Sequence, residues 1–345
     1  MLDKNINNIL FVCEASNFIG SGHLQRCFSL AEHFDFNGWN CIFAVNNTAE
    51  KLLSIMSKKK FKTIIIDWKN LSNLFNFFQN HNVNVLVVDH YELDIVFENQ
   101  CSNYVEKILV IDDLANRKHK CDFLVDQTLS RQKKDYMNLV PTKCKLLVGS
   151  DYIILKKQFI KEKSKMKQKK RSHTSLNILI SFGGSDLYDL TTLSLIVLKE
   201  LKIPFKLKVV LRSISSNVKK ISNLIDSFNG KAKLYLDTNE MEKLINSSDF
   251  GIGACGTSSW ERCFLSLPTI GVKTAENQEL IYNSLVKSKL ILGCGSWKDL
   301  TKKKLTKSIN KIALDSDLRV EMAKRCSKVF DGRGVERIYN YLGKT

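Results

Sequence analysis

The feature that most constrains the fold is a repeated alternation of short apolar runs with amphipathic helical stretches. In the first half the apolar runs are residues 8–14, 41–45, 62–67, 84–91, 107–113 and 123–126. After a polar, basic stretch at 161–173, further runs follow at 176–182, 206–211, 232–236, 250–254 and 269–272, and residues 301–343 have a helical pattern throughout. The runs are continuous rather than alternating, which is typical of strands buried on both faces of a parallel sheet. We therefore expect an α/β protein with two doubly wound parallel sheets.

This pattern divides the chain into four parts. We expect a Rossmann-like domain at 1–160, a basic linker at 161–174, a second Rossmann-like domain at 175–330 and a terminal helix at 331–345 that can cross back to the first domain. The linker is expected because its residues are highly charged and lack apolar periodicity. Ligands of such sheets bind beyond the carboxyl ends of the strands, so the loops that follow strands are the places to seek a site.

Composition indicates a globular protein without a membrane partner. The chain has 345 residues, 44% of them hydrophobic and 26% charged, and no apolar stretch approaches the roughly 18 residues that a membrane span needs. The start "MLDKNINNIL" has an acid and polar residues where a signal peptide would be basic and apolar, so we expect a cytoplasmic protein. The ten cysteines are scattered without a CxxC pair, which favours reduced, buried thiols over a zinc cluster or a disulfide framework.

The net charge of +18 leaves two interpretations open. It comes from 53 Lys and Arg against 35 Asp and Glu. Such an excess can indicate a polyanionic partner, but most of it is Lys and, outside 161–173, it is spread along the chain. An anionic small substrate such as a nucleotide fits the charge equally well, and we expect no nucleic-acid partner.

One His stands in the first glycine-rich loop, "FIGSGHLQRC" at 18–27. His23 is either a base or an ordinary residue of a strand-to-helix corner. A neutral imidazole is a suitable base near pH 7, and the start of a helix disfavours imidazolium. Arg26, one turn farther on, has two interpretations, contact with phosphates or a capping role.

Polar residues also end two later strands of the first half. Asp89, His90 and Tyr91 end the run at 84–91, and Asp112 and Asp113 end the run at 107–113. Carboxylates there can orient a base or bind sugar hydroxyls; the alternative is a helix cap or a salt bridge. We expect no functional role for His119, which lies in a basic loop.

Two turns of the second half are candidate phosphate sites. The first, "SFGGSD" at 181–186, is expected to open a helix at Leu187, with Gly183, Gly184 and Ser185 near the phosphate. The alternative is a tight turn in which Ser185 or Asp186 caps the helix.

The second turn, in "GACGTSSWERCF" at 253–264, offers small residues before a helix that is expected to start near Ser258. Gly256, Thr257, Ser258 and Ser259 can present backbone N–H and hydroxyl groups to a phosphate, and Glu261 lies one turn into the helix. Glu261 either accepts hydrogen bonds from ribose hydroxyls or belongs to a capping box. In "KTAENQ" at 273–278, Asn277 and Gln278 are either solvated or bind the sugar of a nucleotide-sugar.

An ordered set of motifs resembles a known family. The motifs are "GSGHLQRC", "VVDHYELD", "IDDLANRKHKCDFLVDQ", "GSDYIILKKQF", "ISFGGSDLYDLT", "GACGTSSWERCFLSLP", "ENQ" and "DGRGVERI", and they span residues 8 to 340. Together they resemble the PseG family, UDP-sugar hydrolases of pseudaminic acid biosynthesis, and the related spore-coat polysaccharide proteins. The resemblance implies a GT-B fold, in which two Rossmann-like domains face a cleft and the C-terminal one holds UDP.

The implied reaction is hydrolysis of UDP-2,4-diacetamido-2,4,6-trideoxy-β-L-altropyranose to UDP and the free sugar, with inversion and with no metal or cofactor. By this resemblance His23 is the general base, Tyr91 lies in the family's tyrosine-bearing motif, and Asn277 and Gln278 match its substrate-binding pair. We also expect Gly20, Gly22 and Arg26, in the loop and helix around His23, to bind substrate. We expect a cytoplasmic monomer that serves glycan biosynthesis such as flagellin glycosylation.

The sequence departs from the family in one turn. Where a Gly-Ala-Gly-Gly run is expected, Cys255 stands in "GACGT", and its side chain is expected near the pyrophosphate loop. Three alternatives stay open: a MurG-like glycosyltransferase that uses a UDP-sugar donor, a hydrolase of a related UDP-diacetamido sugar, and a basic binding module with a degenerate nucleotide site.

Overall fold

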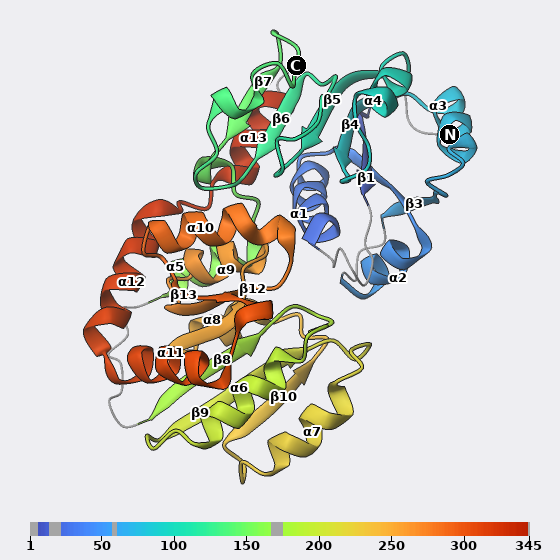
Figure 1. Cartoon of the computed structure of the whole chain (residues 1–345). Helices are drawn as coiled ribbons and strands as arrows, with labels where there is room; N and C mark the ends of the chain where they lie inside the picture. The colour runs from blue at the N-terminus through green and yellow to red at the C-terminus, as the bar shows by residue number, and fades with distance from the viewer. Residues whose placement is uncertain (1–5, 14–21, 57–60, 167–174, 344–345) are drawn as a thin grey trace. The chain divides into compact units, whose positions relative to one another are not determined.

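The computed structural model describes residues 6–13, 22–56, 61–166 and 175–343, without the side chains of 52–56. The chain divides into two compact units (Figure 1). Unit 1 comprises residues 1–156 and 332–345, and unit 2 comprises residues 157–331. The last segment of the chain therefore belongs to the unit in which the chain begins.

Unit 1 contains a seven-stranded, wholly parallel sheet in the order β3-β2-β1-β4-β5-β6-β7. Its strands are β1 (Asn8–Cys13), β2 (Asn40–Val45), β3 (Lys62–Ile65), β4 (Val83–Asp89), β5 (Val105–Ile111), β6 (Phe123–Asp126) and β7 (Lys145–Val148). Its helices are α1 (Gly22–Phe36), α2 (Asn47–Met56), α3 (Ser72–Asn80), α4 (Ile95–Cys101) and α13 (Gly334–Leu342), with short 3₁₀ turns η1 (Lys133–Tyr136) and η2 (Ser150–Tyr152). Six of the seven strands were predicted; β7 was not.

Both faces of this sheet are buried, as the continuous apolar runs predicted. In β1, Ile9 and Phe11 belong to a core with α1 and α13, whereas Leu10 and Val12 belong to the core on the opposite face, which includes residues of α3 and α4. Removal of this apolar surface from water is the main stabilising contribution to such a sheet.

Helix α13 packs in unit 1 against α1 and η2 (Figure 1). Gly334 begins the helix against the turn at Ile153, where a Cβ on residue 334 would lie 2.2 Å from the Ile153 carbonyl oxygen. Only glycine fits so close an approach. Tyr339 of α13 then packs edge-on to Phe34 of α1, with 5.1 Å between ring centroids.

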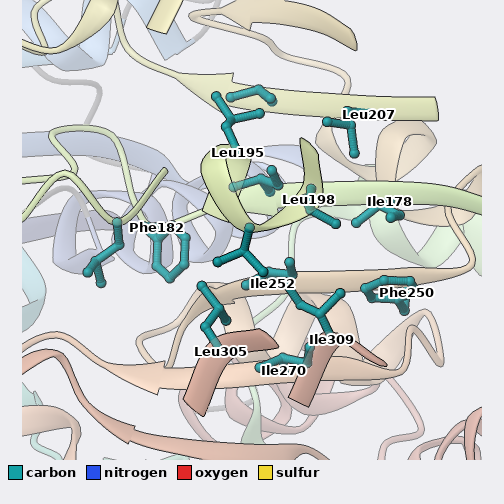
Figure 2. Close-up of a cluster of buried hydrophobic side chains, with 14 of the residues drawn as sticks. Ile178, Phe182, Leu195, Leu198, Leu207, Phe250, Ile252, Ile270, Leu305 and Ile309 are labelled. Atoms are coloured by element: carbon teal, nitrogen blue, oxygen red, sulfur yellow. The ribbon is translucent and has the colours of Figure 1, made fainter. Parts of the chain in front are cut away.

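Unit 2 contains a six-stranded parallel sheet in the order β10-β9-β8-β11-β12-β13. Its strands are β8 (Leu176–Ser181), β9 (Phe205–Leu211), β10 (Ala232–Leu236), β11 (Phe250–Ala254), β12 (Thr269–Lys273) and β13 (Leu292–Ser296). Its helices are α5 (Lys157–Lys165), α6 (Leu190–Lys199), α7 (Val218–Asp226), α8 (Met241–Asn246), α9 (Ser258–Phe264), α10 (Glu279–Lys287), α11 (Lys302–Leu314) and α12 (Ser316–Val329), with turns η3 (Glu276–Gln278) and η4 (Trp297–Asp299). Figure 2 shows its core, in which Leu195 of α6 and Ile309 of α11 lie among strand residues such as Ile178 and Ile252.

Two boundaries differ from the sequence analysis. Residues 161–165, expected in the linker, form the end of α5, which packs against α8 and α9. Phe159 of α5 is buried, and Nζ of Lys163 donates to the carbonyl oxygen of Phe264 at 2.7 Å, so tertiary contacts stabilise a helix whose sequence is mostly charged. The C-terminal segment is helical but broken at Asp315 and at 330–333.

Candidate active site

His23 is the second residue of α1 and is buried, with 4% of its surface exposed. Its Nδ1 lies 3.1 Å from the carbonyl oxygen of Asp89 and 3.3 Å from Oδ1 of the same residue. Because a carbonyl oxygen only accepts, Nδ1 carries the hydrogen and Nε2 keeps its lone pair. Nε2 has no hydrogen-bond partner among the described residues. The ring is therefore oriented with its basic nitrogen unoccupied.

Tyr91 lies against this ring. The two ring centroids are 4.4 Å apart and the planes make an angle of 74°, an edge-to-face contact. Tyr91 follows the end of β4 by two residues, whereas His23 stands at the start of the helix after β1. The structure thus brings together two predicted site residues that are 68 positions apart in the sequence.

Arg26 forms a buried ion-pair network next to His23. Its Nε and Nη2 each lie 2.6 Å from a carboxylate oxygen of Asp89, and its Nη1 lies 3.0 Å from Oδ2 of Asp113. Only 3% of Arg26 is exposed. Of the two interpretations of Arg26, this geometry favours an internal role, because all three guanidinium nitrogens are already bound within unit 1.

The electrostatics keep the imidazole neutral. Burial lowers the pKa of His23 below its usual value of 6.5 and outweighs the opposing charge of Asp89, and Arg26 lowers the pKa further. Burial alone would raise the pKa of Asp89, but Arg26 and His23 hold it below 3.8. At neutral pH the network is therefore a neutral base beside an ionised carboxylate. The sequence argument expected a neutral ring from the helix dipole, whereas the dominant cause here is burial.

These side chains stand where the topology of the sheet changes direction. The chain runs outward from β1 through β2 to β3 and then returns to β4 on the other side of β1. His23 follows β1, Asp89 ends β4, and Asp113 follows β5. Such a switch point is the usual ligand site of an open parallel sheet. Gly22 begins α1 at this point, and Gly20 lies outside the described residues.

A second polar network, beyond β5 and β6, is held together mainly by internal hydrogen bonds, although Nε2 of His119 has no hydrogen-bond partner among the described residues. Asp112 accepts hydrogen bonds from the backbone nitrogens of Leu114 and Ala115 and from Arg117, and the hydroxyl of Tyr136 lies 3.0 Å from its Oδ2. Nearby, Nδ1 of His119 lies 2.6 Å from Oε1 of the buried Glu98. These contacts favour the structural interpretation of Asp112 and His119.

In unit 2 the turn at 181–186 follows β8, and its helix begins later than expected. Gly183 has a φ of +90°, which glycine adopts without strain. Helix α6 begins at Leu190 rather than Leu187, and the carboxylate of Asp186 accepts hydrogen bonds from the backbone nitrogens of Leu190 and Thr191, both at 3.0 Å. Asp186 therefore caps the helix, and these two amides are not available to a phosphate.

Arg212 brings a cation to this turn, and the sequence analysis did not select it. Its backbone nitrogen donates to the carbonyl oxygen of Gly184 at 3.1 Å, and a Cβ on residue 184 would lie 2.6 Å from Arg212 Cδ. Gly184 is thus needed for close approach of an arginine side chain. The signal in the sequence is the position of Arg212 directly after β9.

The turn at 254–259 follows β11, which neighbours β8 at the switch point of the second sheet. Thr257 is the N-cap residue of α9 and its side chain makes no capping hydrogen bond. Ser259 is buried, and its hydroxyl lies 3.3 Å from the carbonyl oxygen of Ala254. Glu261 is the fourth residue of α9, one position beyond the third, where a capping-box acid stands.

Arg262 lies beneath this turn and was also missed. Its side chain is buried, with 1% of the residue exposed. Nη2 donates to the carbonyl oxygen of Ala254 at 2.5 Å, and Nη1 donates to Oγ of Ser258 at 3.1 Å. Nε has no partner among the described residues. Burial lowers the pKa of Arg262, and the nearby charge of Glu261 opposes this shift only in part. The buried cation makes this turn electropositive.

The structure also brings Gln278 to this turn. Its Oε1 accepts from the backbone nitrogen of Thr274 at 2.9 Å, and its Nε2 lies 3.5 Å from the position that a Cβ on Gly256 would take. Asn277 is exposed beside it. Cys255 directly precedes this turn, but its side chain is fully buried, and a Cβ on Gly271 would lie 2.7 Å from its Sγ, so the sulfur packs into the interior.

No protein-family model matches the chain. A curated relative, the UDP-2,4-diacetamido-2,4,6-trideoxy-β-L-altropyranose hydrolase of Campylobacter jejuni, is 25% identical over 272 residues, which are 79% of this chain and 93% of that protein. An uncharacterized protein of Methanocaldococcus jannaschii is 25% identical over 284 residues, and this match covers 81% of the chain but only 58% of the archaeal protein. These similarities support the resemblance to the PseG hydrolases.

Among solved structures, MurG of Acinetobacter baumannii matches with a TM-score of 0.69 at 13% identity, over 98% of this chain and all of that one. The chain has the GT-B fold. The predicted fold class, with two Rossmann-like parallel-sheet domains, is confirmed. In this GT-B chain His23 lies in unit 1, and the two glycine-containing turns lie in unit 2.

A pocket in the second GT-B unit is lined by none of the predicted site residues, although it includes part of the segment 273–278. It has a volume of about 210 Å³ at the carboxyl ends of β12 and β13 and is lined by Lys273, Ala275, Glu276, Ser296, Trp297, Lys298 and Asp299. This volume is below the roughly 300 Å³ at which drug-sized ligand pockets begin.

Across the described ranges, no group of three or more His, Cys, Asp or Glu side chains is arranged to hold a metal ion, and no helix is long and apolar enough to cross a membrane. All ten cysteines are free, and all but Cys144 are buried, as predicted.

Proposed function

We propose that this protein hydrolyses a UDP-sugar, with His23 as the general base. The observation that carries the proposal is the geometry of His23, whose Nδ1 hydrogen is held by Asp89 while its buried Nε2 has no partner among the described residues. A base needs this arrangement, in which one ring nitrogen fixes the tautomer and the other accepts a proton. The proposed substrate is UDP-2,4-diacetamido-2,4,6-trideoxy-β-L-altropyranose, the substrate in the name of the relative from Campylobacter jejuni.

In the proposed reaction, Nε2 of His23 takes a proton from water as the water oxygen bonds to the anomeric carbon. The bond from that carbon to the pyrophosphate oxygen breaks, and UDP leaves with the electron pair. Attack from the face opposite the leaving group inverts the anomeric configuration. The imidazolium that forms is stabilised by the carboxylate of Asp89, 3.3 Å from Nδ1.

The nucleotide is assigned to unit 2. The buried guanidinium of Arg262 donates to the hydroxyl oxygen of Ser258, so the hydroxyl hydrogen is left to donate to a phosphate oxygen. Gly256 and Thr257 belong to the same turn, and Arg212 supplies a cation beside Gly183–Ser185. These groups stabilise negative charge on the leaving pyrophosphate without a metal ion. We assign the ribose hydroxyls to Glu261 and the sugar to Tyr91, Asn277 and Gln278.

The test is incubation of the purified protein with a panel of UDP-diacetamido-trideoxyhexoses in the absence of any acceptor, followed by NMR of the products. UDP release with an inverted free sugar supports the proposal and identifies the substrate. If UDP appears only when an acceptor is added, the protein is a GT-B glycosyltransferase and the hydrolase proposal fails. A panel member other than the altropyranose derivative as the best substrate would change the sugar assignment but not the role of His23.

A further inference from the structure

Two buried polar atoms lie at opposite ends of the Arg26 network with no hydrogen-bond partner among the described residues. They are Nε2 of His23 and Oδ1 of Asp113. The reaction proposed above uses the first and leaves the second unexplained. A buried carboxylate oxygen without a partner is uncommon in proteins, because it loses its hydration and gains nothing in return.

The unpartnered oxygen is not an accident of the loop. The neighbouring Asp112 has both carboxylate oxygens occupied, by backbone nitrogens, Arg117 and Tyr136. Asp113 instead gives Oδ2 to Arg26 at 3.0 Å, while its Oδ1 has no partner in the described part of the chain, and 12% of its side chain is exposed. Arg26 already has two bonds to Asp89, so Asp113 is not needed to neutralise it.

We propose that Asp113 is a substrate-binding residue whose Oδ1 accepts a hydrogen bond from an N–H or O–H group of the sugar. This inference rests on the proposed function and assigns a contact that determines specificity at the same site. An ionised carboxylate accepts and does not donate, so the group that it binds must be a donor, which excludes a phosphate oxygen. The acetamido groups of the proposed substrate carry such N–H donors.

Asp113 and the base belong to one network. Asp113 and Asp89 bind different nitrogens of the Arg26 guanidinium, and Asp89 in turn binds His23. The charge of Asp113 also raises the pKa of His23, which shows that the two side chains interact electrostatically. A sugar whose anomeric carbon lies at Nε2 of His23 would therefore bind beside the network that holds Oδ1 of Asp113, an acceptor without a partner among the described residues.

The variant that tests this contact is Asp113→Asn. Because Arg26 only donates, the amide oxygen of the substituted side chain stays on Arg26, and its NH₂ group takes the position of Oδ1. The N–H or O–H donor of the sugar then faces another hydrogen-bond donor, and no hydrogen bond forms. We expect the KM for the UDP-sugar to rise about tenfold or more, the loss typical of an unmade hydrogen bond to a buried charged group, while the dissociation constant of UDP alone stays unchanged. The matched control is Asp135→Asn, a half-buried carboxylate of the same unit beside Arg131, which should change neither value.

A purely structural role for Asp113 predicts that the Asn variant loses thermal stability and binds the UDP-sugar and UDP more weakly by the same factor. That result would overturn the inference, and so would an unchanged KM. If the wild-type protein hydrolyses nothing, the proposed function fails, and the inference is tested by calorimetry with UDP-sugar and UDP on both proteins. Equal ratios of the two dissociation constants in wild type and variant would overturn it.

Should Asp113→Asn not fold, substrate analogues replace the variant. A UDP-sugar with N-methylated acetamido groups lacks the N–H donors. Binding to the wild-type protein weakened about tenfold identifies an N–H contact, and weakening only in deoxy analogues identifies an O–H contact. If neither change weakens binding, Asp113 does not contact the sugar.

Discussion

Arg26 binds the carboxylate of Asp89 through two hydrogen bonds of 2.6 Å, and the same carboxylate lies 3.3 Å from Nδ1 of His23. One buried acid thus fixes both a permanent cation and a titratable ring of the same helix. The orientation of His23, the proposed base, depends on an ion pair formed one turn farther along α1. We therefore expect changes to Arg26 to affect stability and the proposed catalysis together.

Arg26→Met should destabilise the protein strongly. The substitution leaves Asp89 buried without its main counter-charge, which typically costs about 3–5 kcal/mol. Urea denaturation followed by circular dichroism measures the change. Arg333→Met, which removes the exposed ion pair with Glu336, is the control and should cost about 1 kcal/mol or less. If the two substitutions lowered the free energy of unfolding equally, the buried ion pair would stabilise the protein no more than the exposed one.

His23→Asn should lower kcat at least about 100-fold and leave UDP binding intact, as for loss of a general base. The measurement is UDP release at saturating UDP-sugar, with UDP affinity from calorimetry. His33→Asn, on the same helix but packed on Tyr339 away from the site, is the control. Near-normal turnover of the His23 variant would remove this residue from the mechanism.

The pH dependence of kcat/KM should have its acid limb below pH 6.5, the usual value for histidine. Only neutral imidazole accepts a proton, and burial lowers the pKa of His23. The enzyme therefore stays active as the pH falls, until the pH passes through this lowered pKa. In Asp113→Asn the limb should move to still lower pH, because the charge that raises the pKa of His23 is gone. A wild-type limb centred above pH 6.5 would show that His23 is not the titrating base.

Arg262→Met should weaken UDP binding about tenfold or more, since a charged group contributes roughly 1.5–3 kcal/mol to the hydrogen bonds that it makes. Arg319→Met is the matched control, because Arg319 is another buried arginine of unit 2 and donates to the carbonyl oxygens of Ile312 and Ala313. Both variants should lose stability, but only the first should lose UDP affinity. Arg262→Lys, which keeps the charge, should recover part of that affinity; if it binds no better than Arg262→Met, charge is not the cause.

Gly334→Ala should destabilise the protein by about 1–3 kcal/mol, because overpacking displaces α13 from the turn at Ile153. Thermal unfolding measures the loss. Gly256→Ala is the comparison, since its added Cβ would meet only the side-chain nitrogen of Gln278 at 3.5 Å, an ordinary contact. A stable Gly334→Ala protein would mean that the contact at Ile153 relaxes easily.

The sequence predicted most of the fold because buried parallel strands are continuous apolar runs. One of the two strands that it missed lacks this signal, because β13 is "LGCGS", with two glycines and no β-branched residue. The other, β7, is "KLLV"; it is as short as β3 and β6, which were predicted, so its length does not explain the omission. Helix α5 was missed for a different reason, because its charged sequence becomes helical through contacts with α8 and α9, and the Lys163 bond to Phe264 spans 101 positions of the chain.

The candidate site could be predicted only in part. His23 was selected from its position after a glycine-rich turn, a local feature. The partner of Arg26 lies 63 residues away, so no local pattern distinguished an ion pair with Asp89 from a phosphate contact. Arg262 was missed because burial of a charge depends on packing that a single sequence does not reveal.

The assignment of residues 332–345 to unit 1 affects how the protein can be made. Unit 2 is one uninterrupted segment, 157–331, so it can fold on the ribosome as soon as it emerges. Unit 1 must wait for α13, whose Tyr339 packs on Phe34 of α1. During synthesis, the part of α1 that packs on α13 therefore stays uncovered until unit 2 is complete, and this interval is when a nascent chain would most need a chaperone.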